Sequence, residues 1–451
     1  MKFSISNIGP IKQAELELGD LTVICGRNNS GKTYISYSVY GFLNAVHYNM
    51  KQLLSKKCID KLIEKRTLRI DLDHIVEGVD KQLKISSRDY SANLHEEFSA
   101  SEDDFVKANF RASVDRFGLD YVDNFEHSYT YRKAKFCEVV KKKGDSFVDV
   151  NIIPNADDDE LPKDVLMRLI SSDISRILFG KVCRKVFILT SERTGISLFY
   201  KELDMYRNAL IEEIGRKNVK SRADFLGVID SATSRYAKPI QDSIDSIRDF
   251  EQIMKKKSDL CSRDCNVVLQ QILMGKFRTI NKQLFFCVKP EKDQNEVNVP
   301  LHRVSSAVKS LFSLDMYIRH LAKAGDLLMI DEPELNLHPD NQRKLARLLA
   351  MLVNLGIRVF VTTHSDFVVK EFNNLIILSN DFKKKKTVMK KFGYLPSQLL
   401  RHDLVKIYVA ENSTVYRVPV AKEHGFGLET FDSVICEMNK STGEILYNME
   451  S

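Results

Sequence analysis

Residues 26–33 read Gly26-Arg27-Asn28-Asn29-Ser30-Gly31-Lys32-Thr33. This octapeptide fits the pattern G-x-x-x-x-G-K-[ST] in full. An apolar run at 21–25 precedes it, and a helical pattern through Ile35, Val39 and Leu43 follows it. Such a loop presents backbone N–H groups and the positive end of a helix to phosphate groups. The stretch therefore predicts an ATP site in which Lys32 reaches the β- and γ-phosphates and the Thr33 hydroxyl ligates Mg²⁺.

A second apolar run, at 327–330, ends in two carboxylates, Asp331 and Glu332. Open α/β sheets bind their ligands at the carboxyl ends of the strands, so both acids are expected at the nucleotide edge. We expect Asp331 to hold Mg²⁺, directly or through water. Glu332 is the candidate general base that polarises the attacking water.

A third apolar run, at 359–362, leads into Thr363, His364 and Ser365. A lone histidine is more often structural than catalytic. This one ends a strand expected beside the other two, and its side chain combines donor capacity with a pKa near neutral. We therefore predict that His364 contacts the γ-phosphate and takes part in catalysis.

The remaining patterns predict an α/β fold, because strands and helices alternate as in a parallel sheet with crossover helices. We divide the chain into 1–47 and 271–390, which form the ATPase head, a mainly helical insertion at 48–270, and a small β-rich tail at 391–451. Strands are predicted at 3–8, 14–18, 21–25, 185–189, 284–288, 297–299, 327–330 and 359–362, and a hairpin at 405–409 and 415–420. Helices are predicted at 53–63, 165–178, 198–214, 240–254, 306–324 and 342–354.

The bulk composition is that of a folded protein, with 451 residues, 43% hydrophobic and 29% charged. No apolar run approaches the roughly 20 residues that cross a bilayer. The first residues alternate like a strand and lack a signal peptide. We therefore expect a cytoplasmic protein with no membrane partner.

Two features of the composition leave alternatives open. Cys261 and Cys265 are close in sequence, but no second Cys/His pair follows at zinc-finger spacing, so ordinary reduced thiols are favoured over a metal site. Lysine runs at 141–143, 255–257 and 383–386, with a net charge of +7, fit solvated faces better than contacts with nucleic acid.

The three phosphate-site segments together resemble one family. Residues 331–339 read DEPELNLHP and are followed by Asn341-Gln342; this stretch resembles the Walker B motif of ABC-class ATPases related to RecF, SMC and OLD proteins. Residues 362–365 resemble their switch-histidine loop. Asn28-Asn29-Ser30 resembles the residues that this family usually has at the variable positions of the P-loop. The chain is most similar to stand-alone AAA-family ATPases of bacterial anti-phage defence, such as the ATPase subunits of the PARIS and Septu systems.

The resemblance implies an ABC-type P-loop ATPase head with a large, mostly helical insertion and a small antiparallel C-terminal tail. Two heads are expected to sandwich ATP, so that a signature loop of one subunit faces the nucleotide of the other. The candidate loop is 304–307, with Ser305 and Ser306 as the contacts in trans. Ala307 stands where the family has glycine, which predicts slow hydrolysis because the backbone cannot approach phosphate as closely. His338 takes the D-loop position.

The resemblance leaves the role of residues 190–195 open between a nucleotide contact and a plain helix N-cap. No TOPRIM-like Asp-x-Asp or HNH-like nuclease pattern follows the head. The predicted function is therefore that of an ATP-hydrolysing sensor or scaffold that controls a separate effector, a nuclease or toxin, with a phage protein as trigger and a second copy as partner. The alternative is a RecF-like DNA-repair ATPase that binds DNA directly. A transporter subunit fits less well, because of the long insertion.

Overall fold

The computed structural model describes residues 1–50, 53–115, 121–131, 134–153, 162–200, 202, 236–281, 283–288, 295–427 and 429–450. Within these ranges, no helix combines the length and the apolar character needed to span a bilayer.

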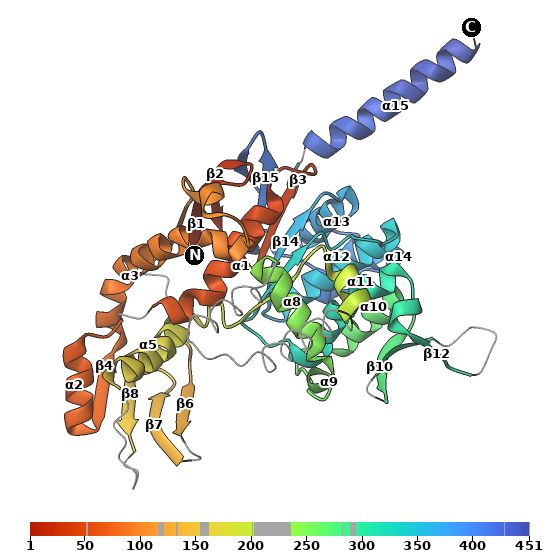
Figure 1. Ribbon diagram of the computed structural model, residues 1–451. Coiled ribbons are helices and arrows are strands. Elements are labelled where there is room, and N and C mark those ends of the chain that lie inside the picture. Colours follow the sequence, from red (N-terminus) through yellow and green to blue (C-terminus); the bar gives the residue numbers. More distant parts are fainter. Residues whose placement is uncertain are drawn as a thin grey trace, which may run out of the picture.

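A nine-stranded sheet forms the centre of the molecule (Figure 1). Five of its strands, β15, β3, β14, β13 and β9, are neighbours and run parallel. The other four, β5, β1, β2 and β16, extend the sheet through mainly antiparallel pairs. In sheet order the strands are β5 (Asn109–Ser113), β1 (Lys2–Ile8), β2 (Ile11–Glu17), β16 (Thr414–Val418), β15 (Val405–Glu411), β3 (Leu21–Gly26), β14 (Arg358–Thr363), β13 (Leu327–Asp331) and β9 (Val186–Leu189).

Both faces of the parallel part of this sheet are buried. In β14, Val359 and Val361 belong to one hydrophobic core, and Phe360 between them belongs to the other. Burial on both faces explains why these strands are continuous apolar runs in the sequence, since no alternate position needs to be polar. The carboxyl ends of β3, β14 and β13 are therefore fixed next to one another.

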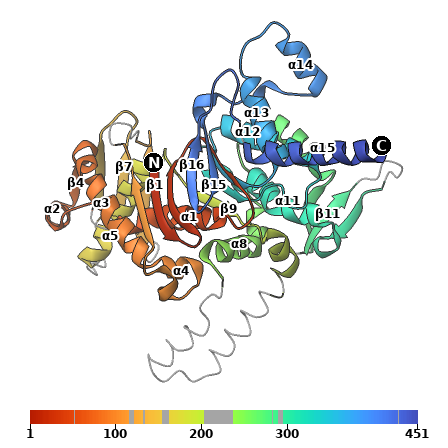
Figure 2. The same ribbon diagram turned by 90° about the horizontal axis from the view of Figure 1, so that it is seen from above.

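One core lies under α1 (Lys32–Asn49) and the elements inserted after it (Figure 2). A four-stranded antiparallel sheet in this region was not predicted from the sequence, which indicated a mainly helical insertion. The helices are α2 (Lys56–Lys65), α3 (Leu72–Ala92), α4 (Leu94–Phe98), the 3₁₀ turn Glu102–Phe105 and α5 (Lys163–Phe179); the sheet contains β4 (Thr67–Asp71), β8 (Phe147–Ile152), β7 (Ala134–Lys141) and β6 (Phe125–Tyr131).

The other core lies between the central sheet and a second group of helices. The three-stranded sheet β10 (Lys276–Ile280), β11 (Gln283–Val288) and β12 (Val297–Pro300) packs at its margin. The helices are α8 (Lys238–Arg248), α9 (Phe250–Ile253), α10 (Arg263–Leu273), α11 (Ser306–Met316) with a π-helical turn at Tyr317–Leu321, α12 (Pro339–Asn354), α13 (Asp366–Ile377) and α14 (Lys385–Phe392). Short 3₁₀ turns occupy Leu301–Arg303, Pro396–Gln398 and His402–Leu404.

The C-terminal region differs from the predicted division. The hairpin is present, but β15 lies beside β3 within the central sheet because Val405, Ile407 and Val409 are buried against it. It is part of the head and not a separate tail. The last 22 residues of the described chain form a helix, α15 (Glu429–Glu450), that was not predicted. The helix predicted at 198–214 falls almost wholly outside the described residues.

Candidate functional site

The P-loop connects the end of β3 to the start of α1. Gly31 has a φ of 88°, and a Cβ atom there would lie 2.6 Å from the Cδ1 atom of Ile11, so only glycine fits. No acidic residue occupies the first turn of α1, which leaves its positive end uncompensated for an anion. An open pocket of about 560 Å³ lies over the loop, lined by Pro10, Asn28, Asn29, Ser30, Gly31, Lys32, Thr33, Tyr34 and Glu332.

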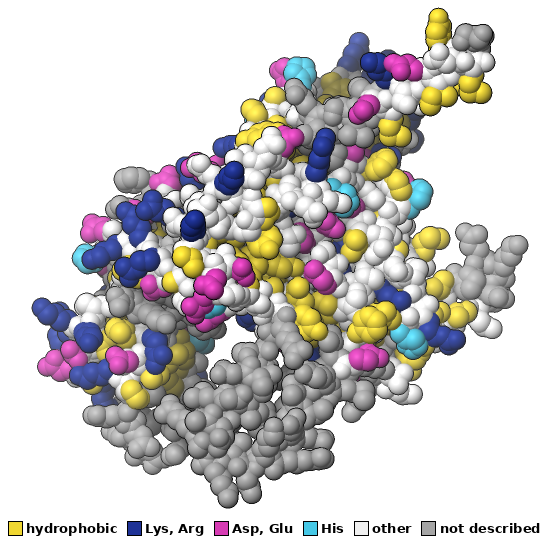
Figure 3. Space-filling model, turned by 45° about the horizontal axis from the view of Figure 1, so that its top comes forward, with side chains coloured by type: hydrophobic (Ala, Val, Ile, Leu, Met, Phe, Trp, Pro, Cys, Tyr) yellow, Lys and Arg dark blue, Asp and Glu magenta, His cyan; other side chains and the backbone are white. Residues whose placement is uncertain are grey.

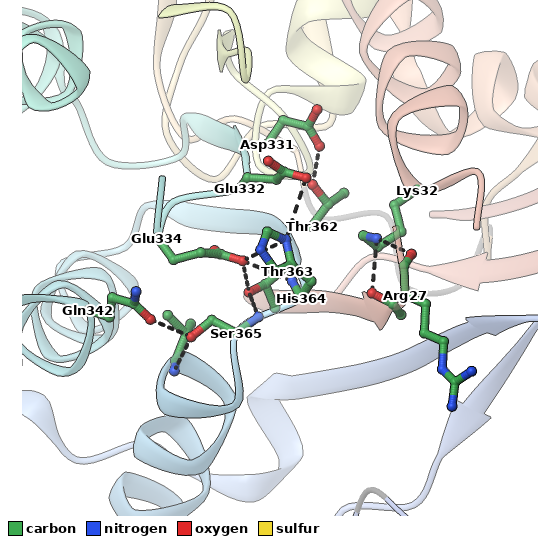
Figure 4. A network of polar contacts seen from close by, with 12 residues as sticks. Arg27, Lys32, Asp331, Glu332, Glu334, Gln342, Thr362, Thr363, His364 and Ser365 are labelled. Carbon is green, nitrogen blue, oxygen red and sulfur yellow. Dashed lines mark hydrogen bonds and ion pairs between the residues drawn. The ribbon is translucent and has the colours of Figure 1, made fainter. Parts of the chain in front are cut away.

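Lys32 is buried at the floor of this pocket. Its ammonium group donates to the carbonyl oxygens of Gly26 at 3.0 Å and Arg27 at 2.7 Å. Gly26 and Arg27 thus contribute backbone acceptors, and the Arg27 side chain points away from the other labelled groups (Figure 4). Burial lowers the pKa of Lys32, while Glu332 and Asp331 act in the opposite direction. A buried ammonium group whose hydrogen bonds go to backbone carbonyls suits a polyanionic ligand.

Asp331, at the carboxyl end of β13, contacts Thr33 at the start of α1. Its Oδ2 atom accepts from the Thr33 hydroxyl at 3.0 Å, and its Oδ1 atom accepts from the Thr362 hydroxyl. Burial raises the pKa of Asp331 to about 6, although both hydroxyl groups favour the charged form. A hydroxyl and a carboxylate oxygen converging in this way form the donor set that Mg²⁺ prefers, so the residues fit the predicted ion.

Glu332, His364 and Glu334 form a charged cluster across the ends of β13 and β14. The Nδ1 atom of His364 lies 3.5 Å from Glu332 Oε1 and 3.4 Å from Glu334 Oε1. The interaction with His364 lowers the pKa of Glu332, and Glu332 in turn raises the pKa of His364. The His364 side chain is 41% exposed, so it remains accessible to a ligand above the loop.

Glu334 holds the histidine loop in place, and sequence reasoning gave it no separate role. Its buried Oε1 atom accepts from the Thr363 hydroxyl at 2.7 Å and from the His364 backbone N–H at 2.8 Å. Ser365 then caps α13 and donates to Gln342 at 2.6 Å. Within the described residues, the Oγ atom of Ser30 in the pocket lining is buried without a hydrogen-bond partner, so this hydroxyl is available to donate to a phosphate oxygen.

Arg193 is the residue that the sequence left unresolved within residues 190–195. Its buried guanidinium donates to four carbonyl oxygens: Ser310 at 3.1 Å, Thr190 at 3.0 Å, Asp331 at 2.7 Å and Glu332 at 2.6 Å. Burial lowers its pKa to about 10, so it stays charged at neutral pH. The segment therefore contacts the Walker B backbone and α11, and Arg193 fixes the peptide groups that carry both carboxylates.

Comparison with known protein families places the chain in one of them. Residues 1–369 match the family described as AAA ATPase domain. The chain belongs to this family. A search of curated proteins finds no match. The family match makes the chain an AAA ATPase. The P-loop and the Walker B segment both lie inside the matched range.

Solved structures give a more distant likeness to this AAA ATPase. The Smc head domain of Pyrococcus furiosus bound to the C-terminal domain of ScpA is 12% identical, with a TM-score of 0.32, covering 97% of this chain and 98% of that chain. The SMC head domain from Thermotoga maritima is also 12% identical, with a TM-score of 0.28, covering 93% and 98%.

The predicted signature residues lie apart from the P-loop pocket of this AAA ATPase. Ser305 and Ser306 are exposed at the N-terminus of α11, where Ser305 caps the helix by accepting from the Val308 N–H at 3.4 Å. Neither residue lines the pocket. His338 likewise caps α12, accepting from the Asp340 N–H. Among the residues that the structure describes, no group of three or more His, Cys, Asp or Glu side chains forms a metal site, and Cys261 and Cys265 are free.

Proposed function

We propose that two copies of this ATPase close over MgATP, with Ser305 and Ser306 of each copy completing the site of the other. The observation that carries the proposal is the division of the site: the P-loop, Asp331, Glu332 and His364 converge at one sheet edge, whereas the two serines face solvent elsewhere. Because the two serines do not line the P-loop pocket of their own chain, they can contact a bound ATP only when it sits on a second copy.

Each residue then has a defined task. Lys32 leaves the carbonyls of its own loop and binds the β- and γ-phosphates. Thr33 and Asp331 would hold Mg²⁺, and the ion would neutralise phosphate charge. Glu332, kept ionised by His364, accepts a proton from the attacking water. His364 donates to the γ-phosphate. Because the next residue, Ser365, caps α13, a shift of His364 on binding the phosphate would be passed to this helix.

A complementation experiment tests the shared site. Lys32→Ala removes the P-loop contact and Ser306→Arg blocks the signature contact, and each variant alone is expected to lack ATPase activity. When the two are co-expressed, mixed pairs regain one intact site, which predicts about a quarter of the parental rate for random pairing between two-fold related subunits. A mixture that stays inactive, or a Ser306→Arg variant with parental activity, contradicts the shared site.

We further propose that the closed pair is a sensor and scaffold that controls a separate effector, a nuclease or toxin, in anti-phage defence. The support is the resemblance of residues 331–339 and 362–365 to the ATPase subunits of PARIS and Septu systems, together with the nucleotide site formed by the P-loop, Asp331, Glu332 and His364. Purification from the native operon is expected to yield the neighbouring gene product bound to the ATPase. A chain that purifies alone and confers no phage protection contradicts this role.

Direct DNA binding is the second candidate, favoured by the exposed lysines at 255–257 and the exposed Lys383, Lys384 and Lys386 on and beside α14. Lys141 is not among these exposed lysines, because it is buried and donates to the carbonyl of Lys142. This role predicts duplex binding that weakens steeply with salt and stimulates ATP turnover. The absence of both effects at low salt rejects it.

A further inference from the structure

Helix α15 stands away from the body of the molecule (Figure 1). Every residue from Glu437 to Met449 is exposed. Its root is firm: Phe426 is buried in the core, and its N–H donates to the side chain of Asn373 on α13 at 2.9 Å. Residues 437–449 therefore form an exposed arm.

The arm carries a narrow apolar stripe. Met438, Thr442, Ile445 and Met449 follow one another at intervals of four, three and four residues. This spacing is the coiled-coil repeat of about 3.5 residues per turn. The Thr442 hydroxyl donates back to the Met438 carbonyl at 3.0 Å, which leaves its methyl group for the stripe. Hydrophobic side chains are visible along this helix in Figure 3. The side chain of Met438 is 65% exposed and that of Met449 is 77% exposed.

The sequence of the arm does not favour a helix standing alone in water. Gly443 lies in its middle, and Asn439, Ser441 and Thr442 are weak helix formers. Isolated helices of this length draw most of their stability from packing an apolar face. The stripe of α15 is the face that such packing would cover.

We propose that the stripe pairs with the same stripe of a second copy, as a short two-stranded coiled coil that forms without nucleotide. The residues flanking the stripe, Asn439, Ser441, Leu446 and Asn448, are uncharged, and Leu446 adds exposed apolar surface on one flank, whereas Glu437, Lys440 and Glu444 lie on the other side of the helix. Two identical surfaces therefore meet without like-charge repulsion. A stripe this narrow fits a single helix of the same kind.

This pairing goes beyond the ATP-dependent closure proposed above and holds two heads at high effective concentration before ATP binds. Sedimentation equilibrium of the full chain without nucleotide is expected to give twice the 51.8 kDa of one chain. Met438→Glu combined with Ile445→Glu is expected to give the mass of one chain. A parental protein that stays at one chain without nucleotide, or a double variant that still pairs, overturns the proposal.

Three controls separate this inference from the shared ATP site. Glu437→Gln combined with Glu444→Gln changes the opposite side of the helix and is expected to leave the dimer intact. Gly443→Ala strengthens the helix outside the stripe and is expected to tighten the dimer. Lys32→Ala is expected to pair normally without nucleotide, whereas its loss of pairing would assign the dimer to the heads and overturn the role of α15. Retained ATP binding by the Met438→Glu/Ile445→Glu protein shows that its head is folded.

Discussion

Replacing Asp331 with asparagine is expected to stabilise the metal-free protein while destroying its site. In the folded chain, burial holds the pKa of Asp331 at about 6, against an ordinary value of 3.8. Because the folded pKa is raised, the folded state binds the proton more tightly, and stability falls as the pH rises from the unfolded to the folded value. A difference of about two pKa units destabilises the folded state by about 3 kcal/mol above pH 7.

Asparagine removes this charge but replaces one acceptor with a donor. One of the hydroxyl contacts, from Thr33 or Thr362, must then turn, at a cost of about 1 kcal/mol. The net gain is about 2 kcal/mol at pH 8. For a chain of 451 residues, with an unfolding entropy of about 2.1 cal/mol/K per residue, this gain raises the melting temperature by about 2 °C.

Calorimetry in EDTA at pH 8 and pH 5 measures the effect. At pH 5 the Asp331 carboxyl is already mostly neutral in the folded state, so the gain is expected to fall below about 1 kcal/mol. Glu371→Gln is the matched control: this buried carboxylate is paired with Arg343 at 2.8 Å and with Arg347, so its loss is expected to destabilise the protein at both pH values. A melting temperature for Asp331→Asn that falls at pH 8, or shifts equally at both pH values, refutes the reasoning.

Three further perturbations probe the site. Gly31→Ala forces a side chain into a left-handed position against Ile11 and is expected to weaken ATP binding at least tenfold by calorimetric titration; parental affinity contradicts the loop geometry. Arg193→Lys cannot span four carbonyl groups, so chemical unfolding is expected to show a loss of at least about 2 kcal/mol along with slower ATP turnover; unchanged values for both show that the guanidinium does not order the Walker B backbone. The raised pKa of His364 predicts a stabilisation that is complete below its ordinary pKa of 6.5 and is lost as the pH rises through the higher folded value. The melting temperatures of the parent and of His364→Gln are therefore expected to converge at alkaline pH. Melting curves that stay equally far apart at all pH values contradict the pairing with Glu332.

Local sequence was sufficient for the parts of the site that depend on one strand and the turn after it. The P-loop, the acids after β13 and the histidine after β14 each follow a strand buried on both faces, which leaves an unmistakable apolar run. Because parallel strands share an edge, their meeting followed from the chain order. The patterns could not show that β15 would enter the sheet beside β3, since that contact joins residues almost 400 positions apart.

The role of Arg193 and the two smaller sheets could not be predicted from local sequence, because both depend on tertiary structure. An arginine after β9 has no local mark of burial, and its role arises because β9 pairs with β13 and α11 crosses nearby. The strands β6, β7 and β8 carry charged residues on their exposed face and were overlooked between stronger helical patterns. Helix α15 was not predicted because Gly443 and its polar neighbours lower the helix propensity of this segment.

We infer that Lys32 and Glu332 act in one ATP site with different tasks, Lys32 in binding and Glu332 in hydrolysis. Calorimetric titration with MgATP, together with turnover measured on the same preparations, tests it directly. Lys32→Ala is expected to lose binding, whereas Glu332→Gln is expected to bind ATP like the parent and to turn it over about 10²–10⁴-fold more slowly. Parental ATP binding by Lys32→Ala, or parental turnover by Glu332→Gln, would contradict the account.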